Sequence, residues 1–276
     1  MKLQALLLAV VAAVFLAACS SGPSLPEPGT PAFLWNEARH AYHSGDMAKA
    51  NDYLSEIQQS DNAFTPRARI WQIVLAGGIA RGYTDLADTY ASGERLNHAD
   101  SLAFHRHVTE LRALAGHTAM DFAQAVHAFI ARDPSTDVQL GFDLPPGSAA
   151  EPVGLRKPYG GGLPLEGEVQ SLQTTMLEKD VIGSICLANG SANDSAQLLS
   201  KFKAEVTTPR STFLYAAAKN LFDVSGVFAL NRLDQPQKFQ VMTQEALSAL
   251  QSVPENDDAK ALIKKIQAAQ KKAAAR

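Results

Sequence analysis

The chain has few of the residues on which several kinds of function depend. Cysteine occurs twice among 276 residues, so a framework of several disulfides is excluded. The formal net charge is -3, whereas a nucleic-acid-binding domain normally needs a strongly basic surface. No Gly-x-Ser-x-Gly sequence occurs, and no two histidines enclose a glutamate at the helical spacing of a zinc protease. We therefore expect no enzyme, no cofactor, no metal site and no nucleic-acid partner.

The first 18 residues have the organisation of a secretory signal, with Lys2 near the start and an apolar run from Leu6. The run closes with Leu16-Ala17-Ala18-Cys19, which resembles the lipobox of bacterial lipoproteins. The resemblance implies that the Cys19 thiol carries diacylglycerol, that the chain is cut before Cys19, and that the new amine is acylated. The alternatives are an ordinary cleaved signal and an uncleaved anchor. A membrane-spanning helix needs about 20 apolar residues, and this run ends at Ser20.

The residue that follows Cys19 bears on location. In the sorting rule that the lipoprotein resemblance implies, aspartate at this position retains a lipoprotein in the inner membrane, whereas Ser20 favours the outer membrane. The resemblance therefore implies a lipid-anchored protein of the outer membrane whose body faces the periplasm. Residues 19–32 are rich in Ser, Gly and Pro, so we expect a flexible tether between the lipid and the body.

The rest of the sequence predicts an all-α body. Alanine is abundant, apolar residues recur at helical spacing, and no convincing strand run is present. From residue 134 to residue 168 the composition changes to Pro and Gly, a density that predicts neither helix nor strand. We therefore expect a helical half over 33–133, a long loop over 134–168 and a second helical half over 169–276. The loop either lies across the body or is a mobile linker.

The segment from Phe33 to Gln59 predicts two amphipathic helices separated by a Gly-Asp turn. The residues that carry the pattern are Ala38, Tyr42, Gly45-Asp46, Ala50 and Leu54. They resemble one tetratricopeptide repeat, although Glu37 stands where that family usually has an apolar residue. The resemblance implies an irregular array of helical hairpins with a concave face. A generic helical hairpin is the alternative.

Part of this order recurs in the second half. The matching residues are Gly183, Leu187, Gly190, Leu199, Ser200 and Phe202, at the spacing of Ala38, Tyr42, Gly45, Leu54, Ser55 and Ile57. Thr208-Pro209-Arg210 then mirrors Thr65-Pro66-Arg67 ahead of an apolar helix. A duplication would make the halves related lobes. The alternative is a chance match between two alanine-rich halves.

Two further features predict packing rather than chemistry. Gly77-Gly78 lies in an apolar helix without a preceding strand, so we expect a close helix contact or a kink there and not a phosphate loop. Cys186 lies in an apolar run, and we expect it to be buried as a small hydrophobic residue.

All seven histidines lie in the first half of the chain. Glu37, His40 and His43 share a helix face, but they form an incomplete ligand set, so no metal site is predicted. The candidates for a catalytic cleft are His98, His105, His107 and His117. A cleft that joins two of these to a carboxylate would favour an enzyme. Dispersed histidines and a dry contact between the halves would favour a scaffold.

The combined expectation is a lipid-anchored helical scaffold that recruits a periplasmic or envelope protein or peptide, as an accessory factor in envelope assembly or for a wall enzyme. Arg39, Tyr42 and His43 are the expected partner-binding residues, because the first helix of each hairpin would line the concave face. The anchor would raise the effective concentration of the body near its partners. The alternatives are an envelope hydrolase or glycan-binding enzyme and a structural spacer between membrane and wall.

Overall fold

The computed structural model describes residues 26–96, 98, 100–141, 166–190 and 206–275. Its α-helices are α2 (Pro31–His43), α3 (Met47–Ile57), α4 (Thr65–Leu96), α5 (Ser101–Arg132), α7 (Glu166–Ala188), α9 (Arg210–Ser225), α10 (Pro236–Gln251) and α11 (Asp257–Ala274). The 3-10 helix η2 (Gly226–Phe228) follows α9 directly, and the two strands are β1 (Asp137–Leu140) and β2 (Val206–Pro209). The prediction of a mainly helical body is confirmed.

Several helices begin where the sequence supplies a side-chain cap. The Thr30 hydroxyl accepts a hydrogen bond from the Phe33 backbone N–H at 3.3 Å, so α2 starts at Pro31, two residues before the expected start of the body. Asp46 caps α3 in the same way, accepting from the Lys49 N–H at 3.1 Å. These caps define where the two helices of the first hairpin begin.

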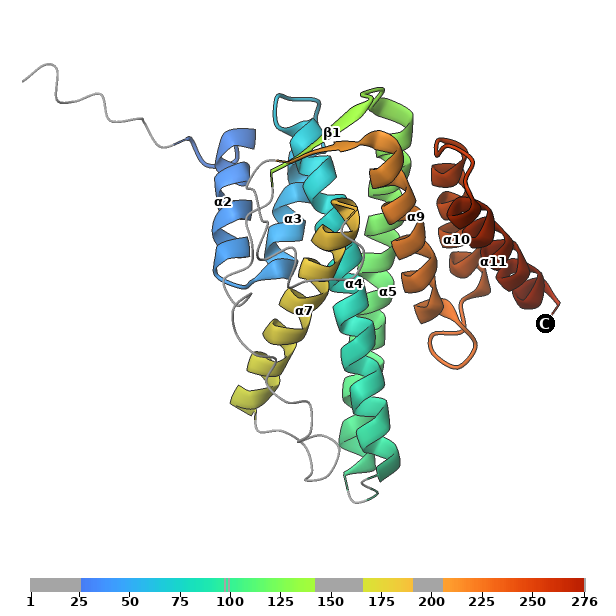
Figure 1. Ribbon diagram of the computed structural model, residues 1–276. Coiled ribbons are helices and arrows are strands. Elements are labelled where there is room, and N and C mark those ends of the chain that lie inside the picture. Colours follow the sequence, from blue (N-terminus) through green and yellow to red (C-terminus); the bar gives the residue numbers. More distant parts are fainter. Residues whose placement is uncertain (1–25, 97, 99, 142–165, 191–205, 276) are drawn as a thin grey trace, which may run out of the picture.

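The long helices α4 and α5 form a central antiparallel pair (Figure 1). The helices α2, α3 and α7 lie on one side of this pair, and α9, α10 and α11 lie on the other (Figure 1). A single cluster of buried apolar side chains runs through both predicted halves, from Leu34 on α2 to Ile266 on α11. The described halves therefore share one core and do not form separate bodies.

The prediction of no strands was wrong at two places. β1 and β2 pair antiparallel, with Val138 opposite Thr208 and Leu140 opposite Val206. Each strand is four residues long, which is too short to show a clear alternating pattern in the sequence. β1 and the start of α7 both fall within residues 134–168, where neither strand nor helix was predicted, and residues 142–165 of that range lie outside the described residues.

The structure also changes the comparison of the two halves. Gly45 and Gly190 both adopt positive φ, of 83° and 71°, shortly after the end of a helix, where glycine is favoured. Thr65 and Pro66 open α4, whereas Thr208 and Pro209 lie in β2, so these matching motifs have different structures. The residues expected to form the second helix of the repeated hairpin, Leu199 to Phe202, lie outside the described residues.

Candidate functional site

The three predicted partner-binding residues of α2 do not share one environment. Arg39 and His43 are exposed, but Tyr42 is only 2% exposed. The Tyr42 ring packs edge-on against Trp71 of α4, with 5.2 Å between ring centroids. Tyr42 is therefore a core residue that fixes α2 to α4, and the prediction that it contacts a partner was wrong. Cys19, the predicted lipidation site, lies outside the described residues.

The histidines of α5 are dispersed along the helix. The paired groups are His105 with Glu94 at 3.2 Å, His107 with Glu110 at 4.0 Å, His117 with Asp121 at 3.8 Å and His127 with Glu245 at 3.2 Å. Each histidine thus has its own carboxylate. Among the described residues, no group of three or more His, Cys, Asp or Glu side chains is placed to hold a metal ion.

Glycines of α4 allow α7 and α9 to pack closely against this helix. A Cβ atom on Gly78 would lie 2.5 Å from the Val181 Cα of α7, and one on Gly82 would lie 2.8 Å from the Leu177 Cδ2. A Cβ atom on Gly77 would collide with the Asn220 side chain of α9. The expected close helix contact at Gly77-Gly78 is confirmed.

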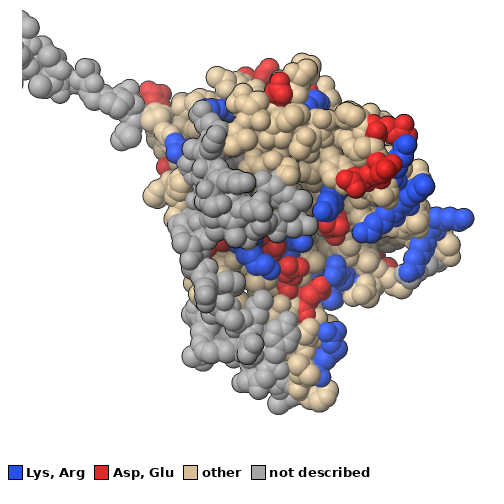
Figure 2. Space-filling view, viewed as in Figure 1, with Lys and Arg blue, Asp and Glu red and all other residues tan. Residues whose placement is uncertain are grey.

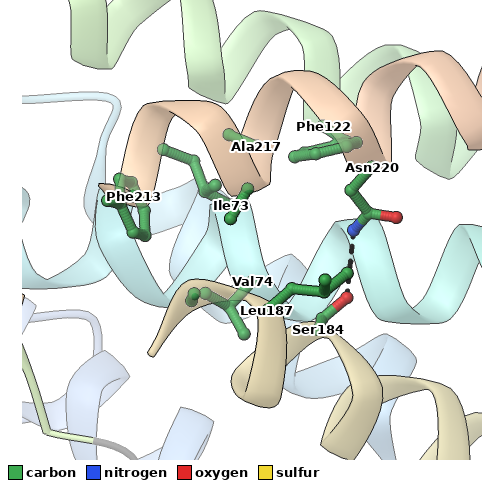
Figure 3. A pocket seen from close by; sticks show the side chains of 10 residues that line it. Ile73, Val74, Phe122, Ser184, Leu187, Phe213, Ala217 and Asn220 are labelled. Carbon is green, nitrogen blue, oxygen red and sulfur yellow. Dashed lines mark hydrogen bonds between the residues drawn. The ribbon is translucent and has the colours of Figure 1, made fainter. Parts of the chain in front are cut away.

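The junction of α4, α7 and α9 leaves a small hollow beside these glycines (Figure 3). Its polar side chains are Asn220 and Ser184, and the Asn220 Nδ2 donates to the Ser184 Oγ at 3.0 Å (Figure 3). The volume is about 10 Å³, which is close to the space that one water molecule requires. This hollow is a packing feature and is too small for a substrate.

The same interface contains a buried carboxylate. Asp180 of α7 is 5% exposed, and its Oδ1 lies 3.7 Å from the Arg81 Nε of α4. Its Oδ2 is buried without a hydrogen-bond partner among the described residues. Burial, reinforced by the negative charge of Asp85, raises the pKa of Asp180 to about 6, although Lys179 and Arg81 act in the opposite direction. The charged form of Asp180 therefore costs stability in the folded protein.

An Asp180→Asn substitution is expected to stabilise the protein at neutral pH. Because the pKa is higher in the folded state, the stability that Asp180 contributes is fully present below the unfolded pKa, near 3.8, and is lost as pH rises through about 6. Asparagine stays neutral, so the free energy of unfolding should rise by about 2 kcal/mol near pH 7.5 and change little near pH 4.

Urea unfolding at both pH values measures this difference. Asp223→Asn on α9 is the matched control, because Asp223 is an exposed aspartate and should change stability little at either pH. A loss of stability in the Asp180→Asn variant near pH 7.5 would contradict the assignment of a strained carboxylate.

A larger hollow lies between η2, the start of α10 and the end of α11. Its volume is about 540 Å³, within the range of sites that bind small molecules or side chains. The apolar lining residues are Phe228, Ala229, Leu230, Pro236, Phe239, Ala269 and Ala273. The charged lining residues are Asp234 and Lys272. We call this hollow the C-terminal groove.

The loop that forms one wall of the C-terminal groove is fixed to the central helix pair. Arg232 forms an ion pair with Asp88 of α4. The Leu233 side chain occupies the space above Gly116 of α5, where a Cβ atom would lie 2.6 Å from the Leu233 Cδ1. Backbone bonds from the Leu233 and Gln235 N–H groups to η2 close the loop at 3.1 Å each. The wall is therefore held in place before any ligand binds.

Leu230 is the unusual residue of this wall. Its side chain is 59% exposed although the loop around it is firmly attached. Because the backbone of this loop is already fixed, little backbone entropy is lost when a partner covers the exposed Leu230 side chain, and this favours contact with a partner. No sequence pattern predicts this site, because its walls come from segments on either side of α10.

Comparison with known proteins finds no family model, no curated protein and no solved structure that matches the chain. A search of the described helices for a segment able to span a membrane finds none that is both long and apolar enough.

Proposed function

We propose that the protein is a lipid-anchored scaffold of the bacterial envelope that holds a segment of a partner protein in the C-terminal groove. The observation that carries the proposal is the exposed Leu230 on a wall that Arg232 and Leu233 fix to the central helices. Such a preformed apolar site binds a partner segment at a low cost in conformational entropy.

The position of the groove also supports recruitment. The described chain begins at Pro26 beside α2, whereas α10 and α11 lie on the far side of the central pair (Figure 1). A body attached to lipid through Cys19 would thus keep the C-terminal groove at a distance from its point of attachment. The anchor would concentrate the body near partners in the periplasm or at the membrane.

Crosslinking in living cells tests this proposal. A photoreactive phenylalanine analogue at Leu230 is expected to give the same discrete crosslinked product as the analogue at Phe239, because both side chains line the groove. A Leu230→Asp substitution, with the analogue at Phe239, should reduce that product by about tenfold, since it places a charge in an apolar contact.

Leu114 of α5 provides the control, because it is 44% exposed and does not line the C-terminal groove. The analogue at Leu114 should not give the product, and Leu114→Asp should leave its yield unchanged. Equal yields from Leu230 and Leu114, or a product that survives Leu230→Asp, would contradict the proposed role of the groove.

A further inference from the structure

Lysines border the C-terminal groove on both helices that form it. Lys272 of α11 lines the groove, and the Lys238 Nζ of α10 lies 5.7 Å from the centre of the Phe228 ring at its floor. Asp234 is the acidic residue of the lining. Arg232, the other charged residue of the wall, is already paired with Asp88. The immediate surroundings of the groove therefore carry an excess of positive charge.

Helix α11, which forms the second wall of the C-terminal groove, adds to this excess of positive charge. The lysines of α11 are Lys260, Lys264, Lys265, Lys271 and Lys272, and all are exposed. After Asp258 the helix contains no acidic residue. Lys272 lines the C-terminal groove, whereas the Lys265 Nζ lies 5.3 Å from the centre of the Phe222 ring of α9. Figure 2 shows basic side chains along the side of the molecule formed by α10 and α11, with acidic side chains at the upper end of that side.

We infer that the partner segment is an acidic amphipathic helix, whose apolar side chains enter the C-terminal groove and whose carboxylates meet Lys238 and Lys272. This inference rests on the proposed function and names the chemistry of the partner. A groove between the ends of two helices accommodates an amphipathic helix through apolar anchors spaced three or four residues apart. Charges at its rim select the partner and steer its approach.

Two matched peptides test the inference. Both peptides are helical, carry a fluorescent label and have leucines four residues apart. At the other positions one peptide has Glu and the other has Lys. They are titrated against the full chain in nanodiscs of uncharged lipid, with empty nanodiscs as the blank. The Glu peptide is expected to bind about fivefold more tightly than the Lys peptide, and this preference should disappear in roughly 0.5 M salt.

Variants separate this inference from the proposed function. Replacing both Lys238 and Lys272 by glutamate should reverse the preference, whereas glutamate at the outward-facing Lys260 and Lys264 should change it much less. Leu230→Asp should weaken the binding of both peptides. If both peptides bind equally well and Leu230→Asp abolishes the binding of both, the inference of an acidic partner is wrong. The proposal that the groove binds a partner segment then still stands. Absence of binding by both peptides, or binding that is insensitive to Leu230→Asp, would count against the groove itself.

Discussion

A Gly78→Ala variant is expected to lose about 3 kcal/mol of the free energy of unfolding, because the new methyl group has no room. The added Cβ atom would lie 2.5 Å from the Val181 Cα and 2.8 Å from the Val181 N. Both are backbone atoms of α7, so no side-chain rotation relieves the contact and α7 must move away from α4. The helix-forming advantage of alanine over glycine, about 1 kcal/mol, offsets only part of this cost.

Gly183→Ala is the matched control, because Gly183 lies on α7, the other helix of this interface, and no atom beyond the nearby backbone of its own helix lies within 4 Å of the position of its Cβ. That variant should be as stable as the natural protein or more stable by up to about 1 kcal/mol. Urea unfolding of the three proteins gives the comparison. Equal stabilities for Gly78→Ala and Gly183→Ala would show that α7 does not pack on α4 as described.

Local chemistry explains what the sequence predicted correctly. Side-chain caps, helical periodicity and the Gly77-Gly78 pair act over a few residues, so α2, α3 and the close helix contact could be expected from the sequence. Burial of Cys186, which is 1% exposed, followed from its apolar neighbours in the same way.

Long-range contacts explain what the sequence did not predict. β1 and β2 are short, and each depends on pairing with a segment far along the chain. Tyr42 does not have the predicted partner-binding role, because its ring packs against Trp71. Sequence spacing does not reveal this contact. The wall of the C-terminal groove depends on the ion pair between Arg232 and Asp88 and on the packing of Leu233 against Gly116. Each of these contacts joins residues that are far apart in the sequence.

Removing the anchor is expected to have the largest effect on location. We propose that Cys19 carries several acyl chains, and each buried methylene contributes about 0.8 kcal/mol to membrane binding. Cys19→Ala, placed behind an ordinary cleavable signal so that no leader remains, should move the protein from the membrane fraction to the soluble periplasmic fraction almost completely. Cys186→Ala, behind the natural leader, should stay with the membrane because it retains Cys19.

The relocation should also reduce the crosslink from Leu230 if the anchor concentrates the body near its partner. Membrane attachment that persists without Cys19 would mean that the body binds the membrane by another surface. In that case the C-terminal groove could still hold a partner segment, but the lipid would not be what delivers it.

The intact mass of the native amino-terminal peptide, isolated from the membrane fraction, is the most direct measurement on the anchored scaffold. The account predicts a peptide that begins at Cys19 and carries diacylglycerol on the thiol and an acyl chain on the amine. A peptide that begins elsewhere, an unmodified Cys19, or a leader that is still attached would contradict it.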